Sequence, residues 1–171
     1  MEYVWWDRGN LLILQAKIRA MTINEIQDEI IEEFSGFDDW MDKYQLLIDL
    51  GNEQEPLDDK YKTEQNLIDG CQSRVWLQAD LVGPTPSPTP VGAVNTKVIH
   101  FSAESDALIV KGIVALLIRV LSDHTPQEIL DADLYFIEEI GLKEHLSPTR
   151  SNGLLAMVKQ MKVYALAFKN L

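Results

Sequence analysis

The feature that most limits how this chain can fold is the segment 107–121, which is apolar on nearly every side of the helix it would form. Only Lys111, Gly112 and Arg119 interrupt it. A surface helix keeps one polar face, whereas a helix that is apolar all round must be buried. The chain has 171 residues, of which 46% are hydrophobic, enough for a single core. We therefore expect this helix to lie in the centre of the fold.

Helix signals lie on both sides of this segment. Thr22 and Glu25 have the spacing of a capping box, and the same pattern recurs at Thr125 and Glu128. With the central helix these signals predict about six helices. The central helix is expected to be capped by Ser105 or Asp106, and the others start at Thr22, at Asp38 (ending at Gly51), at Thr125, before Gly141, and after Ser147 and Pro148.

Alternating aliphatic residues at 75–81 predict a β-strand, and residues 97–102 fit a second. Between them, the proline-rich segment 83–92 suits a stiff hairpin connection; the alternative is a ligand for a proline-binding module. Because the strands are adjacent in sequence, we expect an α+β fold. It would have a small antiparallel sheet of two to three strands packed against about six helices.

Residues 1–20 are expected to be an N-terminal extension to which we assign no function. Their apolar run at 11–14 is too short for an export signal or a membrane span, and Glu2 and Asp7 stand where a signal peptide would be basic. Met21, just before a helix start, is a candidate initiation residue. We expect residues 21–171 to form one domain, without contact to a membrane.

The charge and motif content exclude several classes of function. The chain has 27 acidic and 15 basic residues, a net charge of −12, which argues against a nucleic-acid partner. The three histidines are widely spaced, so no metal site is indicated. Phosphate-binding loops, dinucleotide fingerprints and serine nucleophile elbows are also absent from the sequence.

The single cysteine, Cys71, excludes an intrachain disulfide. A lone cysteine is usually a buried small hydrophobe. Cys71, however, follows Gly70 and precedes the first strand, so we expect it on a loop whose glycine lets the thiol project or retract. Because no second cysteine can resolve an oxidised intermediate within the chain, chemistry with a partner's sulfur fits best.

Three motifs carry a family resemblance. Residues 70–76 (GCQSRVW), then residues 105–107 with 109–112, and finally residues 145–154 (HLSPTRSNGL) resemble the SufE family of sulfur-acceptor proteins. The resemblance extends from residue 21 to the C-terminus. The N-terminal extension and the proline-rich segment depart from the family pattern.

The resemblance implies a SufE/IscU-like fold and a cytoplasmic sulfur carrier rather than a free-standing enzyme. Cys71 would accept a sulfane sulfur from the persulfide of a pyridoxal-phosphate-dependent cysteine desulfurase of the SufS type. It would stimulate that enzyme and deliver the sulfur to an iron–sulfur scaffold. The protein itself would hold no cofactor and no metal. Two alternatives remain: a non-catalytic desulfurase activator in which Cys71 is a bystander, and a thiol redox sensor.

The mobile loop implied by the resemblance consists of Gly70, Gln72 and Ser73 around the cysteine. A persulfide must be kept from cellular thiols between visits, and Trp76 with the aliphatic face of its strand is the candidate shield.

Two further motif residues are candidate contacts. Arg150 would lie near the thiolate or at the partner interface; the alternative is a solvated arginine at a helix start. Asp106 would influence the cysteine loop or its docking, although capping alone also accounts for its position.

Overall fold

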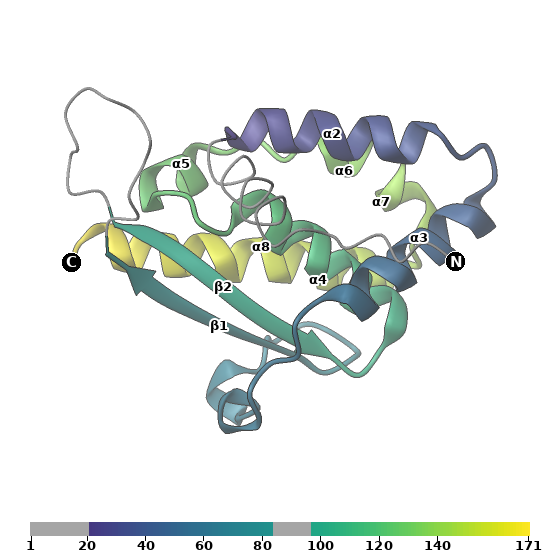
Figure 1. Ribbon diagram of the computed structural model, residues 1–171. Coiled ribbons are helices and arrows are strands. Elements are labelled where there is room, and N and C mark those ends of the chain that lie inside the picture. The colour runs from purple at the N-terminus through teal and green to yellow at the C-terminus, as the bar shows by residue number, and fades with distance from the viewer. Residues whose placement is uncertain (1–20, 84–96) are drawn as a thin grey trace, which may run out of the picture.

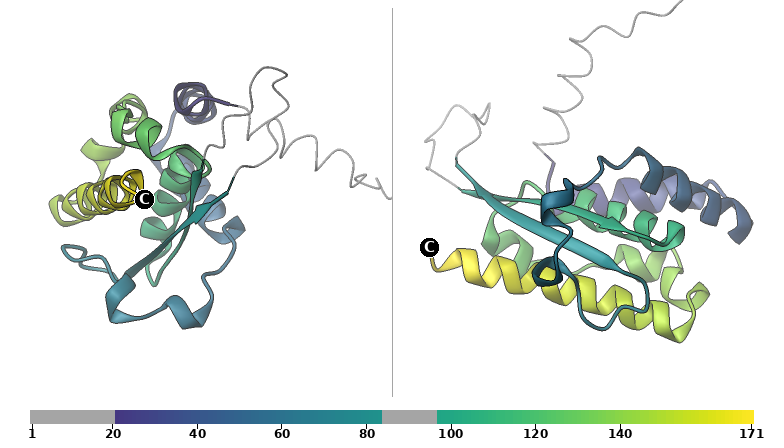
Figure 2. Two further views of the ribbon diagram at one scale, coloured as in Figure 1. Left: turned by 90° about the vertical axis from the view of Figure 1, so that its left-hand side faces the viewer. Right: turned by 90° about the horizontal axis from the view of Figure 1, so that it is seen from below.

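Helix α4 (Leu108–Leu121) is the centre of the fold, as its composition predicts. The computed structural model describes residues 21–83 and 97–171; the N-terminal extension and nearly all of the proline-rich segment lie outside them. The central helix packs against strand β2 (Val98–Ser105) and against helices α2 (Ile23–Ser35), α3 (Trp40–Glu53) and α8 (Pro148–Lys169). Figures 1 and 2 show α4 enclosed between the sheet and these helices.

Strand β1 (Val75–Val82) pairs with β2 in an antiparallel sheet of two strands. The register joins Val75 to Ser105 at one end and Val82 to Val98 at the other. Side chains of a strand alternate between the two faces, so every second residue faces the helices. The buried apolar residues of that face are Val75, Leu77, Ala79, Ile99, Phe101 and Ala103. On the chain leading into the sheet, the 3-10 turns η1 (Asp59–Tyr61) and η2 (Glu64–Asn66) pack against β1.

The predicted α+β class is confirmed, with a two-stranded sheet and seven α-helices among the described residues instead of about six. The difference arises at Gly141, where one helix was expected to end. Its backbone is left-handed, with φ of 73°, and separates two short helices. The short helices of this half are α5 (Pro126–Asp131), α6 (Phe136–Glu139) and α7 (Leu142–His145).

Both predicted capping boxes are present, at Thr22 and Thr125. Two other predicted caps were wrong. Asp39, not Asp38, caps α3 by accepting a hydrogen bond from the Met41 amide at 2.9 Å. Helix α4 begins after Ala107 without any side-chain cap.

Helices α3 and α4 approach each other through glycines. Gly51, predicted to end α3, is instead buried inside it, and the helix continues to Glu53. A Cβ on Gly51 would lie 2.8 Å from the amide nitrogen of Gly112. A Cβ on Gly112 would overlap the carbonyl oxygen of Leu47 and lie 2.6 Å from its carbonyl carbon. The two helix backbones therefore touch, and the central helix has no room for side chains at this crossing.

We expect Gly112→Ala to lower the free energy of unfolding by about 1–3 kcal/mol, because overpacking against a rigid backbone outweighs the gain in helix propensity. Urea denaturation followed by circular dichroism measures the change. Gly36→Ala is the matched control, since its Cβ would meet only the Glu33 carbonyl oxygen at 3.4 Å. If both variants unfold at the wild-type urea concentration, the crossing is not tightly packed.

Candidate functional site

Cys71 lies on a short loop that is closed at its base. The Ile68 amide donates to the Val75 carbonyl at 2.8 Å, so that residues 69–74 project from a narrow neck at the start of β1. Gly70 adopts φ of 89°, a conformation that residues with a side chain rarely tolerate. The loop expected from the sequence is therefore present, and the glycine beside the cysteine has the unusual backbone that turns the chain there.

The thiol is partly buried beside a cavity of about 80 Å³. Its Sγ lies 3.6 Å from the carbonyl oxygen of Gly153, to which it donates a weak hydrogen bond. The apolar walls of the cavity come from Val110 and Ile113 of α4 and from Met157 of α8. The remaining lining residues are Gln72, Ser73, Thr149, Arg150 and Gly153. The cavity thus has apolar side chains on the helix side and polar groups elsewhere, and its lining as a whole is more polar than apolar.

Burial raises the pKa of the Cys71 thiol above its ordinary value. Arg150, although it lines the same cavity, does not offset this effect. In the docked position the sulfur is therefore held as a neutral thiol. The thiolate, which is the nucleophilic form, is favoured only when the loop moves into water or into another electrostatic environment.

Asp106 holds the other end of the loop. Its Oδ1 accepts a hydrogen bond from the Arg74 amide at 3.0 Å, and its own amide donates to the Arg74 carbonyl at 3.3 Å. The carboxylate is thus engaged by the loop and not by the first turn of α4. This contact explains why the predicted cap at Asp106 is missing.

Of the remaining predicted site residues, some line the cavity beside Cys71 and one does not. Gln72 and Ser73 lie on the loop and line the cavity. Arg150, which is exposed in the first turn of α8, lines the same cavity. Within residues 21–83 and 97–171, Arg150 has no carboxylate within ion-pair distance.

Trp76 does not line this cavity. It follows Val75, whose side chain faces the helices, so alternation along β1 turns Trp76 to the opposite face of the sheet. Its backbone also pairs with Leu67 in an isolated antiparallel bridge. The aliphatic face of the same strand belongs to the core, against which Cys71 is also packed. Trp76 is thus on the wrong side to shield the sulfur, and the apolar walls of the cavity belong to α4 and α8.

Sequence analysis missed the residues that line the cavity from the helices. Val110 and Ile113 lie in a segment so uniformly apolar that no face of it could be singled out. Gly153 belongs to the third motif, and Met157 follows it one helical turn later, on the same side of α8. The i, i+4 spacing of these two residues was the signal that could have identified them.

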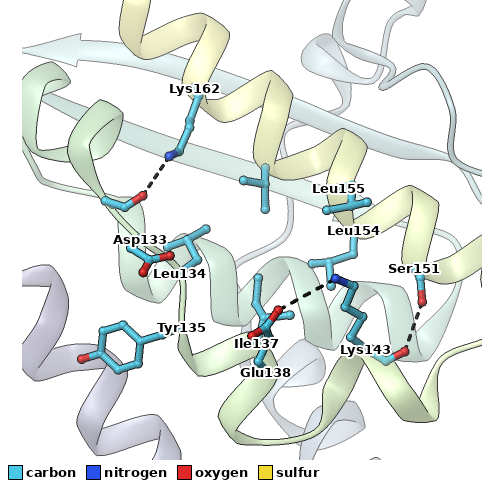
Figure 3. A pocket seen from close by; sticks show the side chains of 12 residues that line it. Asp133, Leu134, Tyr135, Ile137, Glu138, Lys143, Ser151, Leu154, Leu155 and Lys162 are labelled. Atoms are coloured by element: carbon cyan, nitrogen blue, oxygen red, sulfur yellow. Dashed lines mark hydrogen bonds and ion pairs between the residues drawn. The ribbon is translucent and has the colours of Figure 1, made fainter.

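A larger hollow of about 300 Å³ lies between α8 and the chain around α6 and α7 (Figure 3). Leu134, Ile137 and Leu154 contribute apolar surface to it. Lys162 spans one end and donates to the Ala132 carbonyl at 2.8 Å. Cys71 is not among its lining residues, so the two cavities use different sides of the first turns of α8.

Among the described residues, no group of three or more histidine, cysteine or carboxylate side chains is placed to hold a metal ion. Nor does any helix in those ranges have the length and apolar character needed to cross a membrane.

We expect Asp106→Ala to speed alkylation of Cys71 by iodoacetamide about twofold to tenfold, the factor given by loss of one hydrogen bond to the loop. Asp106→Asn is the matched control, because its side-chain oxygen can still accept from the Arg74 amide. Rates are measured by mass spectrometry on the folded protein. Equal rates for the alanine variant and the wild type would show that this contact does not restrain the loop.

Comparisons with known proteins identify a family, a relative and a solved structure that are similar to this chain. The SufE family model, described as an Fe-S metabolism associated domain, matches residues 28–165. An uncharacterized SufE-like protein of Rhizobium meliloti (strain 1021) is 36% identical over 136 residues, which cover 79% of this chain and 91% of that protein. The fold resembles the solution structure of a hypothetical protein from Thermus thermophilus, with a TM-score of 0.65 and 19% identity. That similarity covers 85% of this chain and 97% of the other.

The matched region contains Cys71 and all three of the motifs that surround it in sequence and structure. It extends over most of the described fold, from α2 to α8. The chain therefore belongs to the SufE family, whose domain is associated with iron–sulfur metabolism.

Proposed function

We propose that Cys71 accepts a sulfane sulfur from the persulfide of a SufS-like, pyridoxal-phosphate-dependent cysteine desulfurase, stimulates that enzyme, and passes the sulfur to an iron–sulfur scaffold. The single observation that carries the proposal is the position of Cys71, on a loop closed at its neck and seated beside a small cavity of mixed polarity. Family membership supplies the class of chemistry. A thiol that must stay free suits the reducing conditions of the cytoplasm.

The transfer is a thiol–disulfide type of exchange. The Cys71 thiolate attacks the outer sulfur of the donor persulfide; the donor's S–S bond breaks as a new S–S bond forms, and the donor cysteine leaves as its thiolate. One neutral sulfur atom moves, and no external oxidant or reductant is needed. The proton that Cys71 loses on ionising balances the one taken up by the donor thiolate.

The docked geometry supports storage and the loop supports transfer. Partial burial raises the pKa of the Cys71 thiol and limits its contact with water, and the same position would restrict the access of cellular thiols to a bound persulfide. The cavity of about 80 Å³ exceeds the roughly 10–15 Å³ that a single water-sized group requires, so one additional sulfur atom can be accommodated. For attack on the donor, the loop has to leave this position and the Cys71 thiol has to ionise. Because few hydrogen bonds hold the loop, the free energy needed to move it is small.

The direct test is intact-mass spectrometry after incubation with desulfurase and cysteine. We expect a one-sulfur adduct on the wild type and none on Cys71→Ser, with desulfurase turnover stimulated by the wild type alone. A serine variant that stimulates as well as the wild type would identify a non-catalytic activator. Oxidation of Cys71 by peroxide, without any loading by desulfurase, would identify a redox sensor.

We assign Arg150 to the contact with the donor enzyme, because it is exposed at the rim of the cavity and leaves the docked thiol neutral. Its guanidinium is suited to pairing with a carboxylate of the partner. The overall charge of −12 makes an exposed cation at this rim a specific attraction rather than part of a basic surface.

Arg150→Gln is expected to slow persulfide loading about twofold to fivefold, as loss of one exposed ion pair would. Added salt should slow the wild type toward the rate of the variant. Lys159→Gln, which removes an exposed positive charge elsewhere on α8, is the control and should load normally. A slower alkylation of Cys71 in free Arg150→Gln would instead mean that the arginine acts on the thiolate.

A further inference from the structure

Gly153 occupies an unusual place for a glycine. It is buried in the second turn of α8, where the backbone is helical and no positive φ calls for glycine. Glycine is the poorest helix former apart from proline, so its presence inside a helix requires another reason.

The reason visible in the structure is the sulfur of Cys71. A Cβ built on Gly153 would lie 3.3 Å from Sγ, closer than most Cβ contacts. The same Cβ would be 3.8 Å and 3.9 Å from the Cα and Cβ of Cys71, which are ordinary contact distances. The crowding is therefore with the sulfur alone. The carbonyl of Gly153 also accepts the thiol's hydrogen bond.

We propose that Gly153 is a positioning residue, because its missing side chain lets the Cys71 sulfur dock against the backbone of α8. Gly153 thereby sets the relative populations of a docked loop, with the sulfur against α8, and an exposed loop. A Cβ at 153 would require the sulfur to shift away from α8 by a few tenths of an ångström, and a larger side chain would require more. The effect of Gly153 on the position of the sulfur does not depend on the proposed function. Only its consequence for sulfur transfer rests on that function.

The other walls of the cavity cannot take this role. Met157 is flexible and can adjust its rotamer to the sulfur. Val110 and Ile113 are buried members of the hydrophobic core. A methyl group at 153, by contrast, is held by the helix backbone, which the intrahelical hydrogen bonds keep in place. The loop, which has few attachments, is the part that would give way.

The first test measures Cys71 alkylation in the full chain without desulfurase. Gly153→Ala is expected to react about threefold to tenfold faster than wild type at neutral pH, the factor that follows from losing one weak hydrogen bond. Burial raises the pKa of Cys71, so the midpoint of the variant's pH–rate profile should shift downward, toward that of an ordinary thiol. Gly36→Ala, remote from the loop, should match the wild type in both respects.

The second test separates docking from helix stability. In the Cys71→Ala background no sulfur is present, so Gly153→Ala should raise Tm by about 2–4 °C through helix propensity. With Cys71 present, that gain should be absent or reversed. An equal rise in both backgrounds, together with an unchanged alkylation profile, would overturn the proposal. If Gly153→Ala fails to fold with Cys71 present but is stable without it, the coupling is shown directly.

A third experiment, with desulfurase, separates the positioning role of Gly153 from the proposed sulfur-carrier function. Under the proposed function, persulfide on Gly153→Ala should be removed by dithiothreitol several-fold faster than persulfide on the wild type, because it is less well sheltered. If neither protein is loaded while alkylation still responds to position 153, the sulfur-carrier function fails and the positioning role of Gly153 stands.

Discussion

The burial of α4 on all sides is the constraint on which the rest of the structure depends. The sheet and three helices each cover one side of it, and the contact with α3 is so close that Gly112 meets the backbone of its neighbour. Because the core is closely packed around this helix, the residues at its ends are held in fixed positions. Near its start, Val110 and Ile113 form walls of the cavity beside Cys71. The position of the candidate site is thus a consequence of how the central helix is packed.

The proposed storage and transfer of sulfur would make opposite demands on one thiol. Storage favours a buried, neutral sulfur, whereas attack on a persulfide requires an exposed thiolate. The loop would suit both demands because few hydrogen bonds join it to the body: those at its neck, those between Asp106 and Arg74, and the one from the thiol to Gly153. Asp106 contributes two hydrogen bonds with Arg74 and the thiol contributes one weak hydrogen bond to Gly153, so a partner protein has few interactions to replace when it moves the loop.

Much of the fold was predictable because it follows from local chemistry. The capping boxes at Thr22 and Thr125 and the alternation along β1 depend only on neighbours in sequence. The predictions that failed required knowledge of distant segments. Asp106 was expected to cap α4, but the Arg74 amide competes for its carboxylate. Trp76 was expected to shield the cysteine, but the loop folds toward the helices while the tryptophan faces the other way.

The sequence alone determined the class of fold, the loop position of Cys71 and the family, since each depends on periodicity or on motifs read along the chain. Only the tertiary structure decided what surrounds the sulfur. Gly153 is far from Cys71 in sequence, and its role arises from a contact that forms when α8 packs beside the loop. Such a contact leaves no periodic pattern, because it depends on the space left between elements and not on the order of residues within one.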